Sequence, residues 1–416
     1  MERKWGPMRA FDEVGPGAKI LPQGSRHLPA EETLARISPL KSSFGVTRLA
    51  NLTGLDRTGV PVVMVCRPNA RSSAVFHGKG VDISSAKASG LMEAIETWHA
   101  ENVIAPLRFG AFAEISGESA TVDISGLPRL PDRKFDPMAS ILWLAGRNLF
   151  DSEPTWVPFE LVHASSIVDG PPSSGCFAGS TNGLASGNHH LEATSHAICE
   201  IIERDAASLW RVTPLKERDE RRLDLDAVAD EACLAILDRL ARAEIDVAVW
   251  DITSDIGAPT FRCLLVDKAG ESGHVGIGDA CHPKREIALR RSLTEAAQVR
   301  TTYIIGSRED IDAAVYQPRT LRDRNREARA LMRPTDRHRR FDAVPDFAFE
   351  TFEAEVGWLL GQLKTVGVRQ AIAVDLTRPE FGIPVVRIVI PGLEGMDHHA
   401  SYVPGARAEA LARQLA

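Results

Sequence analysis

The sequence predicts an α+β fold. Segments rich in β-branched residues and amphipathic helical segments follow one another without a strict strand–helix–strand rhythm, which argues against a doubly wound sheet. Three of the helical segments share an unusual feature, a stripe of glutamates beside an apolar face. The chain has 416 residues, of which 44% are hydrophobic, so it is long enough to bury a large core.

The chain divides into a short N-terminal part and one main domain. Residues 1–43 are polar and carry Gly and Pro, which predicts an extended arm with a short helix near residues 31–37. Residues 44–416 are predicted to form the main domain. Its expected strands lie at residues 46–52, 61–66, 141–150, 153–164, 245–253, 260–267, 370–376 and 383–394, and its expected helices at 83–103, within 183–206, at 283–303 and at the C-terminus.

Residues 305–345 differ from the rest of the main domain in composition. Arginines are dense there, with acidic residues interspersed. This pattern predicts a solvated, partly mobile insertion. The alternative is a flap that offers arginines to a phosphate or to an acidic peptide.

Composition excludes several classes of protein. The net charge of −7 argues against a general nucleic-acid-binding protein. The sequence has no apolar run of about 18 residues and no apolar core of a secretory signal, so no membrane span is predicted and the cytoplasm is the expected location. The six cysteines stand far apart without a C-x-x-C pair, which argues against a zinc ribbon.

The three acidic stripes follow from helical periodicity. Residues three, four and seven positions apart lie on one face of a helix, so each group below projects from a single side. Surface helices usually mix acids with Lys or Arg on such a face, because like charges at neighbouring positions repel. The groups are Ser89, Glu93 and Glu96; Glu192, His196, Glu200 and Glu203; and Arg291, Glu295 and Gln298.

Convergence of the three stripes would bring six glutamates into one site. Carboxylates that close cannot stay ionised without strong compensation, and hard divalent cations with all-oxygen ligands, Mg²⁺ above all, provide it. Such a cluster with Lys79, Arg204 and Arg291 nearby suits the phosphates of a nucleoside triphosphate. The usual nucleotide motifs are absent from the sequence: it has no P-loop, no G-x-G-x-x-G after a strand and no kinase motif set.

An ordered set of motifs resembles the YcaO superfamily. The set is G-K-G, then S-x-x-x-E-x-x-E, T-N-G-L-A-S-G-N leading into E-x₇-E-x-x-E-R-D, R-x-x-x-E-x-x-Q, and P-V-V-R-I-V-I-P-G-L-E, and it covers residues 44–394. The resemblance implies a fold with mixed sheets and helices around a non-Walker ATP site. It also implies Mg²⁺ held by glutamates, and phosphorylation of a peptide amide oxygen by ATP.

The resemblance assigns roles to matching positions. It implies metal binding by Glu93, Glu96, Glu192, Glu200, Glu203 and Glu295, ATP contacts by Lys79, Ser89, Asn188 and Arg291, and catalytic roles for Glu200, Glu203 and Arg204. One position departs from the family pattern. The first motif commonly ends in Glu-Arg, whereas Thr97 follows Glu96 here, so one cation is missing.

The reaction expected from the resemblance is amide activation for thioamide formation with a TfuA-type partner. Azoline-forming members typically end in a Pro-rich tail, whereas this sequence ends in a predicted helix. The alternatives are an azoline-forming cyclodehydratase of ribosomal peptides and a catalytically inactive adaptor. The expected partners are a peptide or protein substrate and the TfuA-like protein, and relatives often form homodimers.

Overall fold

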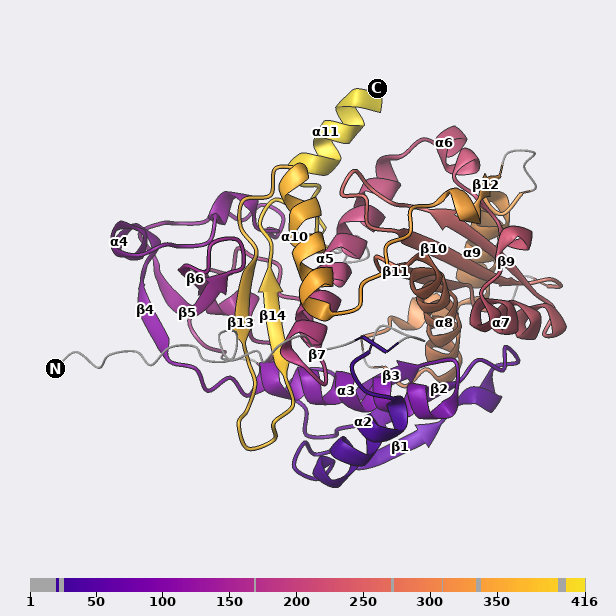
Figure 1. Cartoon of the computed structure of the whole chain (residues 1–416), viewed down its shortest axis with the longest axis horizontal. Helices are drawn as coiled ribbons and strands as arrows, with labels where there is room; N and C mark the ends of the chain where they lie inside the picture. Colours follow the sequence, from indigo (N-terminus) through magenta and orange to yellow (C-terminus); the bar gives the residue numbers. More distant parts are fainter. Residues whose placement is uncertain are drawn as a thin grey trace.

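The computed structural model describes residues 20–21, 26–167, 170–270, 273–308, 310–333, 338–395 and 402–415. The predicted arm at residues 1–19 lies outside this part of the chain. The predicted short helix is α2 (Ala30–Ile37), and it packs against α3 (Ile83–Glu101). The content of 41% helix and 20% strand confirms the α+β prediction. In Figure 1 helix α5 (His190–Val212) lies between a sheet on the left and a sheet on the right, with a third sheet below.

The N-terminal sheet is antiparallel, in the order β1-β2-β3. Its strands are β1 (Arg48–Asn51), β2 (Val62–Cys66) and β3 (Val75–Lys79), and α3 (Ile83–Glu101) covers it. Helix α3 lies unusually close to β3, because a Cβ at Gly78 would stand 2.1 Å from the carbonyl oxygen of Ala86. The close packing of α3 on β3 therefore requires a glycine at position 78, the first glycine of "HGKG".

The second sheet has the order β11-β10-β9, also antiparallel. Its strands are β9 (Ile245–Asp251), β10 (Thr260–Asp267) and β11 (Gly276–Cys281), and it packs against α7 (Glu231–Arg242) and α8 (Arg285–Ile305). The approach of α8 to β11 again depends on a glycine, since a Cβ at Gly278 would lie 2.3 Å from the carbonyl oxygen of Ser292.

The largest sheet has the order β4-β5-β13-β14-β7, with β6 paired to β5. Helix α5 (His190–Val212) packs on β14 and β7, and α10 (Phe352–Thr365) packs on α5. The strands are β4 (Leu107–Ala111), β5 (Ser140–Asn148), β6 (Pro154–Pro158), β7 (Leu184–Ser186), β13 (Ile372–Asp375) and β14 (Val385–Val389).

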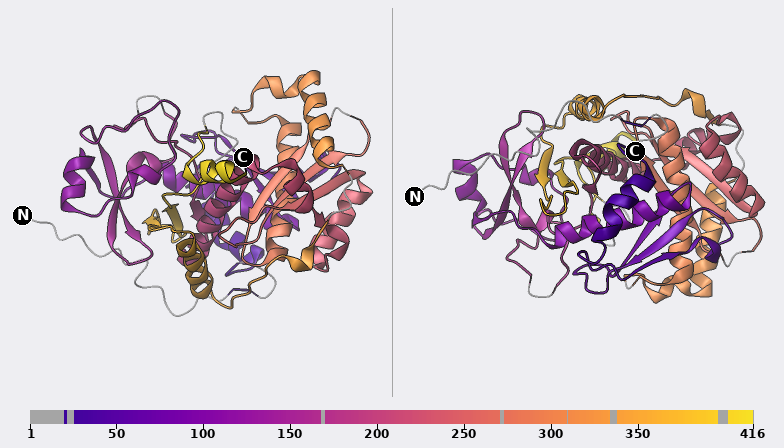
Figure 2. Two further views of the ribbon diagram at one scale, coloured as in Figure 1. Left: turned by 90° about the horizontal axis from the view of Figure 1, so that it is seen from above. Right: turned by 60° about the horizontal axis from the view of Figure 1, so that its bottom comes forward.

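The remaining elements lie outside these three sheets. A parallel pair of two-residue strands links the chain before α7 to the chain after α9, and α11 rests on α5 near the C-terminus (Figure 2). These elements are α4 (Phe112–Glu118), α6 (Leu215–Glu220), β8 (Leu223–Asp224), α9 (Pro318–Leu331), β12 (Arg339–Arg340) and α11 (Ala406–Leu415). Among the described residues, no helix combines the length and the apolar character needed to cross a bilayer.

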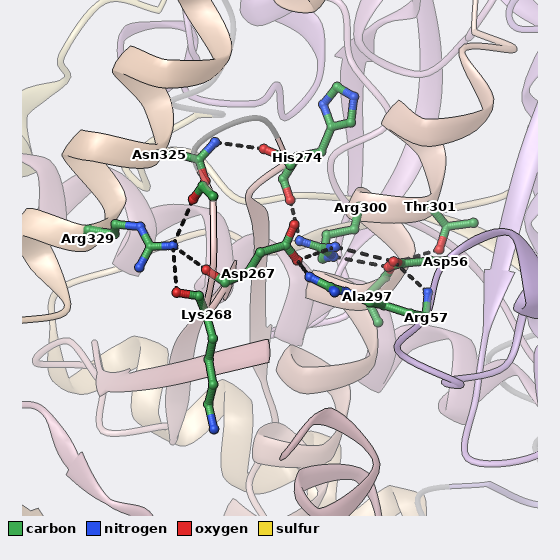
Figure 3. Close-up of polar contacts among 12 residues, drawn as sticks. Asp56, Arg57, Asp267, Lys268, His274, Ala297, Arg300, Thr301, Asn325 and Arg329 are labelled. Carbon is green, nitrogen blue, oxygen red and sulfur yellow. Dashed lines mark hydrogen bonds and ion pairs between the residues drawn. The ribbon is translucent and has the colours of Figure 1, made fainter. Parts of the chain in front are cut away.

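The arginine-rich segment at residues 305–345 is more closely packed than the sequence predicts. Its helix α9 buries Asn325, whose side chain donates to the carbonyl of Gly273 at 2.7 Å. Arg329 donates to the carbonyls of Asp267 and Gly270 (Figure 3). The prediction of a solvated segment fails for this inner face of α9, because polar side chains there satisfy carbonyls of the β10–β11 connection.

Six elements contact one another in a closed ring. Helix α3 contacts β3 and β7, α5 contacts β7 and β11, and α8 contacts β11 and β3. Helices and strands therefore alternate around one centre, and each helix is held between strands of two different sheets. The three helices are those that carry the acidic stripes, so their stripes can face one another across this ring.

Candidate active site

Five of the six predicted glutamates come together inside the ring. We call them the glutamate site; they are Glu93, Glu96, Glu200, Glu203 and Glu295. The charges of Glu200 and Glu295 disfavour ionisation of Glu93 and of Glu203, and Glu93 and Glu200 disfavour that of Glu96. The convergence expected from the helical stripes is therefore present for five carboxylates, contributed by α3, α5 and α8.

The last residue of each ring strand contacts one of these carboxylates. Two contacts use a backbone N–H group and one uses an ammonium group, so each strand end supplies a donor to an acid on a neighbouring helix. The contacts are Lys79 Nζ to Glu295 Oε2 at 2.6 Å, Ser186 N–H to Glu96 Oε2 at 2.8 Å, and Cys281 N–H to Glu203 Oε2 at 3.3 Å. The ring thereby fixes the positions of acids that repel one another.

Four carboxylates of the site, on α3 and α5, are hard to ionise. Burial raises the pKa of Glu93 to about 7; Lys79 and Arg308 oppose the rise, and Glu295 and Glu200 add to it. Burial also raises the pKa values of Glu96, Glu200 and Glu203, and neighbouring acids add to each rise. The chain's own cations therefore do not balance the negative charge of the site at neutral pH.

Two arginines border the acids. Arg204 Nε lies 3.8 Å from Glu203 Oε1, and although burial disfavours its cation, Glu203 and Glu200 raise its pKa overall. Arg387 projects from β14, where burial lowers its pKa to about 10 against the effect of Glu200 and Glu96. Its Nη2 donates to the Ser180 carbonyl at 2.6 Å, whereas its buried Nε and Nη1 have no partner among the described residues.

Arg387 is a site residue that the sequence reasoning missed. Two unpaired guanidinium N–H groups in a buried position indicate an anionic or carbonyl group that the chain itself does not provide. The available signal was a charged residue inside the otherwise apolar run "PVVRIVI". A charge at a buried strand position needs a partner, so its presence in that run marks a site.

Glu192 lies apart from the other glutamates. It is buried at the N-terminal end of α5, where its Oε1 is 3.3 Å from Arg26 Nη1 and its Oε2 accepts from the Asn188 N–H at 3.0 Å. The side chain of Asn188 donates to Thr33 Oγ1 at 3.0 Å. Eight residues along a helix correspond to about 12 Å, which separates Glu192 from Glu200 although both face the same side.

A second polar group surrounds the N-terminal half of α5. Ser195 donates to Glu355 of α10, and His282 Nε2 lies 3.9 Å from the other carboxylate oxygen of Glu355. Burial lowers the pKa of Arg291 to about 10, and Arg26 adds to that fall. The sequence reasoning missed Glu355 and His282, because neither lies on an acidic stripe.

A family model described as "YcaO cyclodehydratase, ATP- and Mg²⁺-binding" matches residues 77–394. The chain belongs to the YcaO family. A relative described as a protein in the tfuA 3′ region of Rhizobium leguminosarum bv. trifolii is 33% identical over 91% of this chain and 90% of its own length. A second, from Methanothermobacter thermautotrophicus, is 33% identical over 87% of this chain and 93% of its own length. These matches confirm the predicted family.

Solved structures confirm the YcaO fold. The structure of YcaO from Methanopyrus kandleri bound with AMPPCP and Mg²⁺ has a TM-score of 0.70 at 24% identity, over 91% of this chain and 95% of that one. A heterocyclase in complex with substrate and cofactor has a TM-score of 0.77 at 21% identity over 93% of this chain. This chain spans 55% of that heterocyclase. The cofactors predicted from the sequence, ATP and Mg²⁺, agree with those of the family.

The glutamate site fits the YcaO cofactors by charge and by donor type. Carboxylate oxygens are ligands that Mg²⁺ prefers, and a divalent cation would stabilise the ionised forms that burial, with the repulsion of neighbouring acids, disfavours in Glu93, Glu96, Glu200 and Glu203. Within the described ranges, no three His, Cys, Asp or Glu side chains are arranged closely enough to hold an ion as they stand.

At Thr97, where the family commonly has Arg, the hydroxyl donates to the Glu93 carbonyl at 3.0 Å and brings no charge. Arg308 compensates in part, because it favours the ionised form of Glu93.

Proposed function

We propose that this YcaO protein uses ATP to phosphorylate the oxygen of a peptide backbone amide, and that a sulfur nucleophile then attacks the activated carbonyl carbon and displaces phosphate, forming a thioamide. The glutamate site is the observation that supports ATP-dependent chemistry. A 33% identical relative is described as a protein in a tfuA 3′ region. This description supports a TfuA-type partner for the present protein, and hence thioamide formation.

The proposed step balances without an oxidant or a reductant. The amide oxygen attacks the γ-phosphorus of ATP, and the bond to the β–γ bridging oxygen breaks, releasing ADP. A sulfide sulfur then bonds to the amide carbon, and phosphate leaves with the former amide oxygen. Magnesium, when bound, would neutralise phosphate oxygens during the transfer.

The residues of the chain would have distinct tasks in this reaction. We assign magnesium to the glutamate site and to Glu192, the phosphates to Lys79 and Arg291, and further nucleotide contacts to Ser89 and Asn188. Arg204 and Arg387 border the carboxylates and would place positive charge beside the phosphorylated oxygen. Glu200 and Glu203 are the residues whose removal should affect catalysis most.

A second candidate is azoline formation, in which a Cys, Ser or Thr side chain of the substrate attacks its own preceding carbonyl. The family description "cyclodehydratase" favours it. Both reactions share the phosphorylation step, so the site described above serves either one. An inactive adaptor is disfavoured, because a scaffold gains nothing from buried acids that repel one another.

Titration calorimetry with ATP and Mg²⁺ tests the shared step. The wild type should bind ATP only with Mg²⁺, and Glu200→Gln should lose this dependence. Glu353→Gln, at an exposed glutamate on α10, is the matched control. Absence of magnesium-dependent binding in the wild type would refute ATP-dependent amide activation.

Intact mass of a co-expressed substrate peptide separates the two reactions. Replacement of oxygen by sulfur raises the mass, whereas azoline formation removes one water. A mass gain that requires the TfuA-like protein supports thioamide formation. Loss of water without that protein would instead identify a cyclodehydratase.

A further inference from the structure

A pocket of about 300 Å³ lies beyond the glutamate site. It is bounded by the C-terminal end of α5, by α6, by one face of the β9–β11 sheet and by the end of α9. Its floor is apolar and includes Trp210, Trp250 and Leu264. Leu215 and Ile277 also line it, and they remain 65% and 44% exposed. We call it the tryptophan pocket.

Positive charge surrounds this apolar floor. Arg218, Arg262 and Arg333 line the pocket together with one acid, Asp219, and Arg262 is also paired with Asp279 beside the pocket. Arg218 donates to the carbonyls of Trp210 and of two neighbouring residues at 2.9 Å, and carbonyls do not neutralise its charge. Burial and the charge of Arg262 both lower the pKa of Arg218, so the two cations lie near each other. An anionic group placed between them would be stabilised.

The tryptophan pocket adjoins the glutamate site. Trp210 lies about two turns beyond Glu203 on α5. On β11, Ile277 of the pocket and Asp279 occupy alternate positions and so face the same side. Asp279 is the bidentate partner of Arg262, and its charge also raises the pKa of Glu203. The Arg262–Asp279 ion pair therefore lies near both the pocket and Glu203.

We propose that the tryptophan pocket binds the substrate peptide through an apolar side chain of the peptide and a carboxylate beside it. The proposal rests on the proposed function, since it names the feature by which a peptide is held next to the glutamate site. Tryptophan and arginine are the residues that most often dominate recognition of a protein partner. The volume suits one or two side chains, and the excess of arginine selects an acidic segment.

The arginine-rich segment gains a role under this proposal. Leu331 and Arg333, at the end of α9, form one wall of the pocket. The contacts of Asn325 and Arg329 with the β10–β11 connection hold that wall in place (Figure 3). The segment thus acts as a fixed wall offering arginine to an acidic peptide, close to the flap considered from the sequence.

Fluorescence anisotropy of a labelled octapeptide tests the pocket. The probe has a central Leu-Phe pair with three glutamates on each side, and the control probe carries lysines in place of the glutamates. The full-length wild type should bind the acidic probe at least about tenfold more tightly than the basic one. Equal affinity for the two probes would overturn the proposal.

Variants at Leu215 locate the binding. Leu215→Glu places a carboxylate among the arginines and should weaken binding of the acidic probe about tenfold, whereas Leu215→Lys should weaken it far less. Leu234→Glu, at a 43% exposed leucine on α7 outside the pocket, is the matched control and should leave binding unchanged. Equal losses in Leu215→Glu and Leu234→Glu would refute the pocket as the site.

Calorimetry with ATP and Mg²⁺ on the same preparations separates the two proposals. All three variants should bind ATP as the wild type does. Absence of ATP binding in the wild type would refute the proposed function. Normal ATP binding with probe affinity unchanged in Leu215→Glu would refute the tryptophan pocket alone.

Discussion

The pKa of Glu93 has a direct consequence for stability. Its value rises from 4.5 to about 7 on folding, mainly because of burial. The folded protein therefore binds this proton more tightly than the unfolded chain does. As the pH rises through this interval, the unfolded chain ionises first, so the folded state loses stability. Glu93→Gln removes the ionisable group at nearly constant shape and should remove this loss.

The magnitude follows from the shift. A difference of about 2.5 pKa units corresponds to about 3 kcal/mol once the pH exceeds 7. Glu93 keeps some solvent contact, which reduces the value, so Glu93→Gln should be about 1–3 kcal/mol more stable than the wild type at pH 8. Well below pH 4.5, where Glu93 is protonated in both states, the difference should fall towards zero.

Urea unfolding of the metal-free protein, with a chelator present, measures this difference between pH 5 and pH 8. Glu353→Gln should change the free energy of unfolding by less than about 0.5 kcal/mol at every pH. A Glu93→Gln protein less stable than the wild type at pH 8 would refute the reasoning. A stability gain independent of pH would refute it as well.

Three further predictions concern the scaffold. Arg300→Ala leaves the buried carboxylate of Asp56 without its cation, whereas Asp267 keeps its ion pair with Arg57, and the free energy of unfolding should fall by about 3–5 kcal/mol in urea titrations; a change below about 1 kcal/mol would contradict the ion-pair network. Gly278→Ala should force α8 away from β11 and weaken magnesium-dependent ATP binding in calorimetry, whereas Gly117→Ala, with no atom within 4 Å of its added carbon, should not. Arg329→Ala should expose α9 to limited proteolysis, and an unchanged cleavage pattern would show that its carbonyl contacts do not hold the helix.

The glutamate site could be anticipated because helical periodicity alone places acids on one face. Glu93 with Glu96, and Glu200 with Glu203, needed no knowledge of tertiary structure. The same projection ignores the rise along the helix axis, which is why Glu192 was grouped with acids about 12 Å away. Angular position is a local property, whereas the depth at which a helix meets its neighbours depends on packing.

Other features could not be read from the sequence. Strand β7 (Leu184–Ser186) has three residues and no alternation, so its pairing with β14 depends on the distant strand. Glu355 becomes a site residue only through Ser195, 160 positions away. The inner face of α9 was missed because a single buried Asn325 carries little weight in a segment dense in arginine.

The closed ring of helices and strands governs how the chain must fold. Lys79 and Glu295 are 216 residues apart, and the ring closes only when α8 meets β3. Such long-range closure is slow, because the chain loses conformational entropy before the stabilising contacts form. The acids of the glutamate site also repel one another as they approach. We therefore expect the centre of the ring to be the last region to form. A fragment that ends before α8 should build individual sheets but bind no nucleotide.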